Sequence, residues 1–260
     1  MDPGTLIGIV IALVCIIVSM ILEGGNPMSI ILIPPLLLVF GGTFGAAMAG
    51  GPLKDTTGLV RWVKKALLAP MPNVNELIGV MVTLAERARR EGLLALEEAA
   101  KDIEDPFLKK GLELAVDGTD PEQVRELLEI ELDAKKADDK AGAKFFEAMG
   151  GYAPTVGIIG TVLGLIHVLE NLNEPDKLGH LIAAAFVATL WGVLSANVFW
   201  LPMAAKLKRL SELENQNMNL LIEGITSIQA GANPRLVEMK LLACLPPLER
   251  RSLEEEKEAA

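Results

Sequence analysis

Two threonines are the polar side chains placed deepest in the long apolar stretches of this 260-residue chain. Thr161 lies about 12 Å from one end of the stretch 150–169, and Thr189 lies about 16 Å from the matching end of 178–201, at about 1.5 Å per helical residue. The two hydroxyls could face each other, and hydroxyl oxygens are ligands of the kind that hard cations prefer. Threonine in an apolar helix also often bonds its own backbone or a neighbouring helix. Position alone leaves both interpretations open.

Ionisable side chains are absent from the middle of the apolar stretches. Those near the stretches lie at or within about a turn of the edges: Glu23, His167, Glu170 and His180. Cys15 and Cys244 lie too far apart in the expected topology to pair and have no metal-ligand spacing, so we interpret them as two buried small side chains. No Ser/His/Asp, Cys/His, phosphate-loop or metal arrangement occurs in the sequence. We therefore predict a protein without enzymatic activity, bound metal or cofactor.

Four long apolar stretches must position these groups: residues 6–22, 28–49, 150–169 and 178–201. Each approaches or exceeds the ~20 residues that cross a hydrocarbon core. Because lipid satisfies no backbone polar group, each is expected to be a helix. The sequence thus predicts an all-α integral membrane protein with four transmembrane helices. Its expected parts are a first transmembrane pair (1–50), a helical cytoplasmic domain (51–149), a second transmembrane pair (150–202) and a helical C-terminal tail (203–260).

The positive charges set the expected orientation in the membrane. Every lysine and arginine except Lys177 lies in 51–149 or after residue 202. The positive-inside bias places those segments, and hence both termini, in the cytoplasm. The formal net charge of −10, carried mainly by these parts, argues against nucleic acid as a partner. Membrane lipid is the surrounding that the apolar stretches require.

Small residues and prolines punctuate the second transmembrane pair. Gly157, Gly160 and Gly164 form a ridge that permits close helix approach, either within one chain or against another subunit. Pro154 and Pro202 lie near the inner ends of their stretches, where each removes a backbone hydrogen bond and favours a kink. We interpret the prolines either as joints of moving helices or as helix boundaries without motion.

The cytoplasmic part is expected to consist of helices. Residues 74–101 have near-helical periodicity with a break at Gly92, and 106–116 form a second helix ended by Gly118. A third helix begins at Asp120-Pro121 and can continue into 150–169. The stretch 178–201 can likewise continue to Gln229. Two long stalks would result.

Two surfaces of the cytoplasmic part carry further candidates. Residues 52–70 are amphipathic and are expected near the membrane surface, with an apolar face formed by Val60, Val63, Leu67 and Leu68. Arg89 and Glu97 lie about two helical turns apart, so both can project from one exposed face. An exposed charged face is more often only solvated.

Five strings along the chain carry a family resemblance. They are GYAPTVGIIGTVLGL (151–165), AAAFVATLWGVLSANVFWLPMAAKLKR (183–209), ARREGLLALE (88–97), DPFLKKGLELAVDG (105–118) and NPRLVEMKLLACLP (233–246). Together they closely resemble the A subunit of the bacterial flagellar motor stator, the MotA/PomA family of the MotA/TolQ/ExbB superfamily. The resemblance covers the whole chain, and several long motifs in the right order are more specific than any single one.

The resemblance implies a homopentamer of this chain around a dimer of MotB/PomB-type B subunits in the bacterial inner membrane. In the family each B subunit has one span with an ion-binding aspartate, which would explain why this chain has no acid of its own at mid-depth. Ion flow, of Na⁺ or H⁺, would make the ring step around the dimer. The cytoplasmic domains would then push on the rotor protein FliG.

The resemblance also implies roles for particular residues. The candidates for the rotor contact are charged and lie in or next to one motif: Arg89, Arg90, Glu97 and Glu98. Pro154 and Pro202 match the membrane-boundary prolines of the family, which would couple ion occupancy to movement. Thr161 and Thr189 match its ion-pathway hydroxyls, and because sodium-driven relatives tend to carry threonine at the position of Thr161, sodium is favoured over protons as the coupling ion.

Two other classes remain open. An ExbB/TolQ-type proton-driven energiser of outer-membrane processes is similar only over the later half and has three spans, whereas this chain has the extra apolar pair and the ARREGLLALE string. A solute carrier is the other class, and no internal repeat suggests alternating access. The extra apolar pair and the ARREGLLALE string favour the stator.

Overall fold

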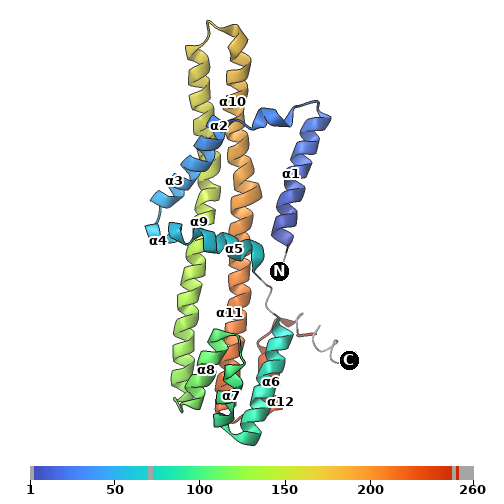
Figure 1. Ribbon diagram of the computed structural model, residues 1–260, viewed down its shortest axis with the longest axis vertical. Helices are drawn as coiled ribbons and strands as arrows, with labels where there is room; N and C mark the ends of the chain where they lie inside the picture. The colour runs from blue at the N-terminus through green and yellow to red at the C-terminus, as the bar shows by residue number, and fades with distance from the viewer. Residues whose placement is uncertain (1–2, 70–72, 248–249, 252–260) are drawn as a thin grey trace. The chain divides into compact units, whose positions relative to one another are not determined.

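The computed structural model describes residues 3–69, 73–247 and 250–251, and within these ranges the backbone is helical with no strand. The chain divides into two compact units (Figure 1). Unit 1 comprises residues 1–71 and 138–210, and unit 2 comprises 72–137 and 211–260. The end of the expected amphipathic segment, Pro70, and the end of the expected tail, 252–260, lie outside the described residues.

Unit 1 contains the apolar helices and, between them in the described sequence, two short helices that carry charged residues. In chain order they are α1 (Gly4–Leu22), η1 (Pro27–Ile30), α2 (Ile33–Leu36), η2 (Leu37–Gly41), α3 (Gly42–Ala49), α4 (Leu53–Thr57) and α5 (Leu59–Leu68), followed by part of α9 (Pro121–Glu170), α10 (Pro175–Leu194), η4 (Ser195–Trp200) and the start of α11 (Leu201–Gln229). The two predicted continuations are correct, because α9 runs unbroken through its apolar part and α11 ends at Gln229. Both long helices belong in part to each unit.

The second apolar stretch departs from the expected single helix over 28–49. Residues 27–30 form a 3₁₀ turn, Leu32 is extended, and the helix begins at Ile33. Pro34 and Pro35 explain the late start, because proline lacks an N–H and is tolerated only in the first turn of a helix. From Ile33 the chain is helical to Ala49, passing through the π-helical segment η2.

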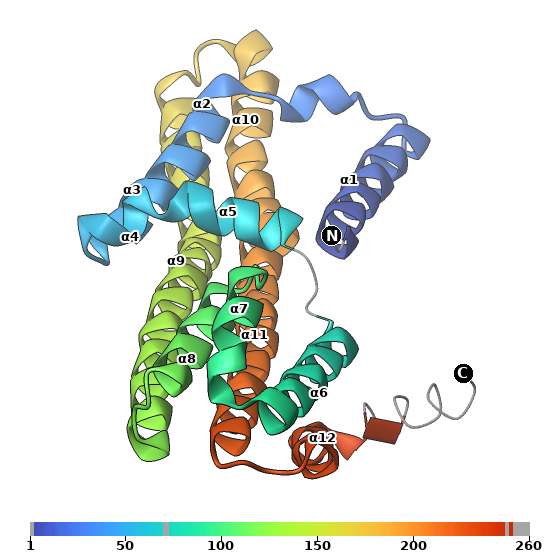
Figure 2. The same cartoon turned by 60° about the horizontal axis from the view of Figure 1, so that its bottom comes forward.

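Three described helices are long and apolar enough to cross a membrane: Gly4–Leu22, Pro121–Glu170 and Pro175–Gln229. The helix Ile33–Ala49 is apolar but shorter. The pairing of apolar stretches is visible in unit 1, where α9 and α10 lie side by side (Figure 1) and remain so in the turned view of Figure 2. α1 stands off from this pair and has no buried residue.

The core of unit 1 is aromatic. Trp62 from α5 is buried against Gly142, where a Cβ would lie 2.7 Å from the indole. Phe146 stacks on Trp200 at a centroid distance of 6.4 Å, and the Phe40 ring lies 6.2 Å from that of Trp200. Two ion pairs flank Trp62: Arg61 with Asp138 at 2.6 Å and Lys65 with Asp139 at 2.7 Å. The expected apolar face of residues 52–70 is therefore partly wrong.

The buried side of α5 is set by these contacts with α9. Trp62 and Ala66 are buried and Val63 packs beside them, whereas Val60 is 78% exposed. Leu68 is also exposed. Periodicity had predicted a face made of aliphatic side chains. The buried face is instead centred on the Trp62 indole, which fills the space left by the missing side chain of Gly142.

Unit 2 has an aliphatic core. Its helices are α6 (Val74–Glu91), η3 (Leu93–Ala95), α7 (Leu96–Lys101), α8 (Pro106–Val116), α12 (Pro234–Ala243) and the parts of α9 and α11 that fall in this unit. The predicted breaks hold: Gly92 and Gly118 have φ of +84° and +77°, a region that favours glycine. The Asp120 carboxylate accepts a hydrogen bond from the N–H of Glu122 at 2.9 Å, which caps α9 as expected.

The expectation that both cysteines are buried is wrong. Cys15 lies on α1 and Cys244 directly follows α12, and both are exposed in the described chain rather than buried. Since α1 buries none of its residues in this unit, a small side chain on it has nothing here to cover it.

Candidate functional site

The two threonine hydroxyls meet where α9 and α10 lie side by side. Thr161 Oγ and Thr189 Oγ are hydrogen-bonded to each other, and both side chains are partly buried. Thr161 Oγ also lies 3.1 Å from the carbonyl oxygen of Ala185 and 3.3 Å from that of Gly157. Thr189 Oγ lies 3.3 Å from the same Gly157 oxygen. The predicted facing of the two hydroxyls is correct.

This group, the hydroxyl cluster of Thr161, Thr189 and the carbonyls of Gly157 and Ala185, contains four oxygens and only two hydroxyl protons. Two protons can serve two of the four contacts at any time, since a hydroxyl has a single O–H to donate. The cluster thus satisfies itself by local hydrogen bonds and still presents unused oxygen lone pairs. Local hydrogen bonding of the threonines and binding of a cation by their oxygens are therefore both compatible with this geometry.

The carbonyls of Gly157 and Ala185 are the backbone oxygens of this cluster, and the sequence prediction had not named them by residue. The Gly157 carbonyl is central to it. It lies within hydrogen-bond distance of both hydroxyls, one on its own helix and one on α10, and can accept from either. A signal was available, because Gly157 stands four residues before Thr161 and a threonine hydroxyl commonly bonds the carbonyl at that spacing.

Small residues bring the two helices close enough for this contact. A Cβ at Gly157 would lie 2.8 Å from the Ala188 carbonyl oxygen, and at Gly160 or Gly164 it would lie 2.5 Å from the Cβ of Ala188 or Ala185. The predicted ridge therefore packs within the chain, which is the simpler of the two interpretations. A stripe of glycines removes the side chains that would hold the helices apart.

The inner proline of α11 follows a disturbed stretch of helix. Residues 195–200 form the π-helical segment η4, which ends with the N–H of Leu201 bonded to the carbonyl of Ala196. Pro202 comes next and has no N–H to donate. π-helical turns are rare and concentrate at functional sites. The backbone directly before Pro202 is thus π-helical, and the kink expected at Pro202 and its role as a joint stay predictions.

Pro154 lies inside α9, which continues through it. The neighbouring Ala153 is fully buried, and a Cβ at Gly192 would lie 2.7 Å from its carbonyl oxygen. α9 thus packs closely on α10 next to this proline, and the helix remains intact despite the lost donor.

The charged candidates of unit 2 lie at the exposed turn between α6 and α7. Arg89 and Arg90 end α6, and Glu97 and Glu98 begin α7. All four side chains are exposed. Arg89 and Glu97 lie on different helices, because Gly92 with its φ of +84° separates α6 from α7, and their projection from one exposed face stays a prediction.

Ion pairs connect the two sides of this turn. Arg87 binds Glu98 at 3.2 Å and Glu91 at 3.4 Å, and Arg90 lies 3.9 Å from Glu86. Arg87 was not predicted as part of the group, although its spacing of four residues to Glu91 is the usual one for a helical ion pair. The group is a mixed-charge surface rather than a patch of one sign.

Comparisons with known families cover nearly the whole chain. Residues 99–220 match the MotA/TolQ/ExbB proton channel family, and residues 6–92 match the Motility protein A N-terminal family. The hydroxyl cluster and both prolines fall in the first match, and Arg89 and Arg90 fall in the second.

Relatives of full length agree with these matches. Motility protein A of Bacillus subtilis is 40% identical over 264 residues, covering 100% of this chain and 96% of the relative. The structure of C. jejuni MotAB has a TM-score of 0.90 at 34% identity, covering 95% of this chain and 97% of that one. The flagellar MotAB stator complex from Bacillus subtilis has a TM-score of 0.88 at 39% identity, covering 96% and 98%.

Proposed function

The chain belongs to the MotA/TolQ/ExbB proton channel family, and from that premise we propose that it is a stator subunit of the bacterial flagellar motor. It is a membrane protein of the inner membrane and forms an ion channel together with a MotB-type partner. The channel converts ion flow into torque on the rotor. The chain itself has no enzymatic activity and needs no cofactor.

The observation that carries the proposal is the hydroxyl cluster in an acid-free setting. Thr161 and Thr189 meet at the close contact of α9 and α10, and the stretches 150–169 and 178–201 contain no Asp or Glu. An ion path needs a site of higher affinity than two neutral hydroxyls provide, and a partner that brings a carboxylate beside them supplies it. A subunit with oxygens but no acid is suited to such a shared site.

The assembly follows from the same family membership. Five copies of this chain surround a dimer of the MotB-type partner, and the rotor protein FliG is contacted by the exposed turn with Arg89, Arg90, Glu97 and Glu98. All four apolar stretches cross the membrane, including the shorter helix Ile33–Ala49. Both termini are cytoplasmic, in keeping with the positions of the lysines and arginines.

The coupling ion is sodium. Na⁺ is a hard cation that exchanges hydration oxygens for protein oxygens. The hydroxyls of Thr161 and Thr189 and the carbonyls of Gly157 and Ala185 lie together and provide several. A proton would need only the carboxylate of the partner.

The sodium proposal is tested by swimming speed in cells that rely on this stator. Speed is expected to rise with external sodium at fixed pH and membrane potential, and Thr161→Ala is expected to weaken that dependence. Thr161→Ser is the matched control, because it keeps the hydroxyl and removes only a methyl group. Motility that is independent of sodium in the unmodified chain would mean that protons drive the motor.

The proline proposal is tested separately by Pro202→Ala. Alanine restores an N–H directly after η4 and allows a regular helix there. The variant is expected to assemble with its partner and to generate little torque, measured on tethered cells. Loss of assembly would make the proline structural, and full torque would remove it from the mechanism.

An ExbB/TolQ-type energiser is the competing function within the same family. The match of residues 6–92 to the Motility protein A N-terminal family favours the stator. Restoration of swimming in a bacterium that lacks its own stator A subunit, when this chain is expressed with its B partner, tests the choice. Restored colicin or siderophore uptake without swimming would favour the energiser.

A further inference from the structure

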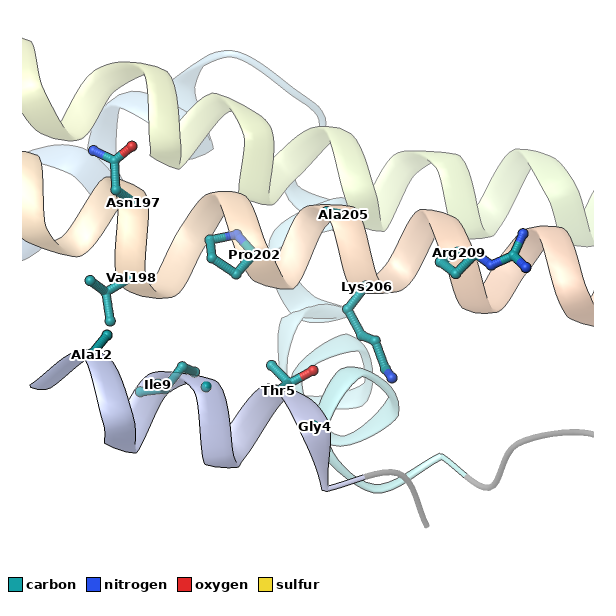
Figure 3. A pocket seen from close by; sticks show the side chains of 11 residues that line it. Gly4, Thr5, Ile9, Ala12, Asn197, Val198, Pro202, Ala205, Lys206 and Arg209 are labelled. Atoms are coloured by element: carbon teal, nitrogen blue, oxygen red, sulfur yellow. The ribbon is translucent and has the colours of Figure 1, made fainter.

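A cavity of about 550 Å³ lies between α1 and the helix formed by η4 and the start of α11 (Figure 3). All of its lining residues belong to unit 1. Its volume falls within the ~300–1,000 Å³ typical of small-molecule pockets. The hydroxyl cluster does not line it, so it is distinct from the site described above.

Two facing helical stripes form the walls. On α1 the stripe includes Thr5, Gly8, Ile9 and Ala12, which recur at spacings of three or four residues. A Cβ at Gly8 would meet no atom within 4 Å, so the cavity is open at this position. The opposite stripe contains Val198, Pro202, Ala205, Lys206 and Arg209.

The two ends of the cavity differ in polarity along the helix axis. One end is mainly aliphatic, with Ile9, Ala12 and Val198 beside the neutral amide of Asn197, and the other end carries Thr5, Lys206 and Arg209 (Figure 3). In Figure 3 the Lys206 side chain reaches from α11 toward the beginning of α1, where Thr5 lies. The cavity therefore has an uncharged, mainly aliphatic end and an end lined by two basic side chains.

A neighbouring lysine serves as an internal comparison. Lys208 lies between Lys206 and Arg209 in sequence but does not line the cavity. The two cations that do line it are three residues apart, on one face of α11. The positive charge at the cavity thus comes from the face of α11 that carries Lys206 and Arg209, and Lys208 does not contribute to it.

We propose that this cavity binds one anionic phospholipid of the inner leaflet. The headgroup phosphate is bound by Lys206 and Arg209 with the hydroxyl of Thr5, and the beginning of an acyl chain lies along Ile9, Ala12 and Val198. Arginine and lysine form strong charge-assisted hydrogen bonds with phosphate oxygens. Basic pockets between membrane helices on the cytoplasmic side are suited to anionic headgroups.

Charge and surroundings favour a lipid over a soluble anion. α1 buries none of its residues, and its other sides expose aliphatic side chains such as Val10 and Val14. In a membrane-spanning helix those sides face lipid, so the mainly aliphatic end of the cavity lies next to acyl chains. The choice of the inner leaflet rests on the proposed cytoplasmic location of Lys206 and Arg209. The lipid proposal does not depend on the motor function.

The first test measures phospholipid retained by the full-length chain, purified from membranes in its native complex and analysed by native mass spectrometry. The complex is exchanged into nanodiscs of phosphatidylglycerol diluted in phosphatidylcholine. Wild type is expected to retain phosphatidylglycerol in preference to phosphatidylcholine. Because each juxtamembrane cation contributes roughly fivefold, the double variant Lys206→Gln/Arg209→Gln is expected to lose that preference by about thirtyfold. The control Lys208→Gln is expected to keep it.

The second test fills the cavity without changing charge. Gly8→Leu places a side chain in the open space and is expected to displace the retained lipid, whereas Val10→Leu, on the exposed side of α1, is expected to leave it bound. Equal retention in wild type and in the double variant would overturn the proposal. So would a wild-type complex with no retained lipid, in which a second copy of the chain or the partner subunit fills the space.

The readout also separates this proposal from the proposed function. Lipid content is measured without motility, so a chain that retains phosphatidylglycerol selectively supports the cavity proposal whether or not it drives a motor. Loss of swimming in the Thr161 variants with unchanged lipid content would bear on the ion path alone.

Discussion

Two helix contacts in this chain are built in opposite ways. The contact of α9 with α10 in unit 1 consists of glycines against alanines and a pair of hydroxyls, and the stretches 150–169 and 178–201 contain no Lys, Arg, Asp or Glu. The contact of α9, α11 and α12 in unit 2 buries large aliphatic side chains and is bordered by charges. There Glu223 binds Arg125 at 2.8 Å and Lys240 at 3.1 Å.

The difference follows from the surroundings of each contact. Within lipid, burying an apolar side chain gains little, so helices associate through close packing and hydrogen bonds. In water the burial of leucine and isoleucine supplies the driving force, and ion pairs at the edge add little. In the first contact, an added methyl group would meet backbone atoms and should be destabilising. In the second contact, an added methyl group should be tolerated where it meets a side chain that can move.

The largest expected effect comes from Gly157→Ala. The new Cβ would lie 2.8 Å from the Ala188 carbonyl oxygen and 3.1 Å from two Cα atoms, and backbone atoms cannot move aside as a side chain can. We expect a loss of about 1–3 kcal/mol in stability and separation of the two hydroxyls. Thermal unfolding of the purified complex and swimming assays measure both consequences.

Two glycines provide the controls for that prediction. Gly151→Ala on the same helix adds a Cβ that meets nothing within 4 Å, and it should be neutral. Gly111→Ala in unit 2 contacts the terminal methyl of Ile225 and should cost less than Gly157→Ala, since a flexible side-chain end can move. If Gly111→Ala were the more damaging of the two, the contrast between the contacts would be incorrect.

Charge reversal at the turn between α6 and α7 should affect motility and leave stability nearly unchanged. Arg89→Glu together with Glu97→Arg alters exposed side chains, so the free energy of unfolding should change by no more than about 0.5 kcal/mol. Assembly and ion conductance should remain, and swimming should be impaired. Glu126→Lys, an exposed reversal elsewhere in unit 2, is the control. Normal swimming of the double variant would remove these residues from the rotor contact.

The smallest expected effect is a dependence of unit 2 on pH. Burial raises the pKa of Glu223, but hydrogen bonds from Arg125 and Lys240 and their positive charges outweigh burial and hold the pKa below its usual value of 4.5. A carboxylate with a lowered pKa stabilises the fold above its unfolded-state pKa and loses that contribution as the pH falls through its folded-state pKa. Stability should therefore fall as the pH is lowered beyond about 4.5.

Glu223→Gln isolates this contribution. The variant should be less stable than wild type near neutral pH by about 1 kcal/mol, and the difference should shrink in acid. Circular dichroism melting curves recorded across the acidic range compare the two proteins. Glu126→Gln should follow wild type at every pH, and a Glu223→Gln curve parallel to wild type would mean that another carboxylate causes the acid dependence.

Local signals in the sequence predicted much of this structure. Asp105-Pro106 and Asp120-Pro121 located the starts of α8 and α9, because an aspartate cap and a proline in the first turn act on the nearest residues. Gly92 located the break after α6 for the same local reason. The contact of the two threonines was also predictable, since depth in two antiparallel helices fixes which positions can meet.

Features that depend on distant residues were not predictable in the same way. The buried side of α5 depends on the space left by Gly142, and the separation of Arg89 from Glu97 depends on the direction that the chain takes after Gly92. The late start of the helix at Ile33 was readable in Pro34 and Pro35, but hydropathy alone extends the stretch to Met28. Periodicity identifies a helix more reliably than it identifies what the helix packs on.

The aromatic core of unit 1 has a spectroscopic consequence. The three tryptophans of the chain, Trp62, Trp191 and Trp200, all lie in unit 1. Trp62 is buried, Trp200 stacks on Phe146, and the Trp191 indole donates a hydrogen bond to the Ile30 carbonyl at 2.7 Å. Indole emission therefore reports the melting of unit 1 without any introduced label, while the far-ultraviolet circular dichroism of the helices sums over both units. A difference between the two curves would measure how strongly the units unfold together.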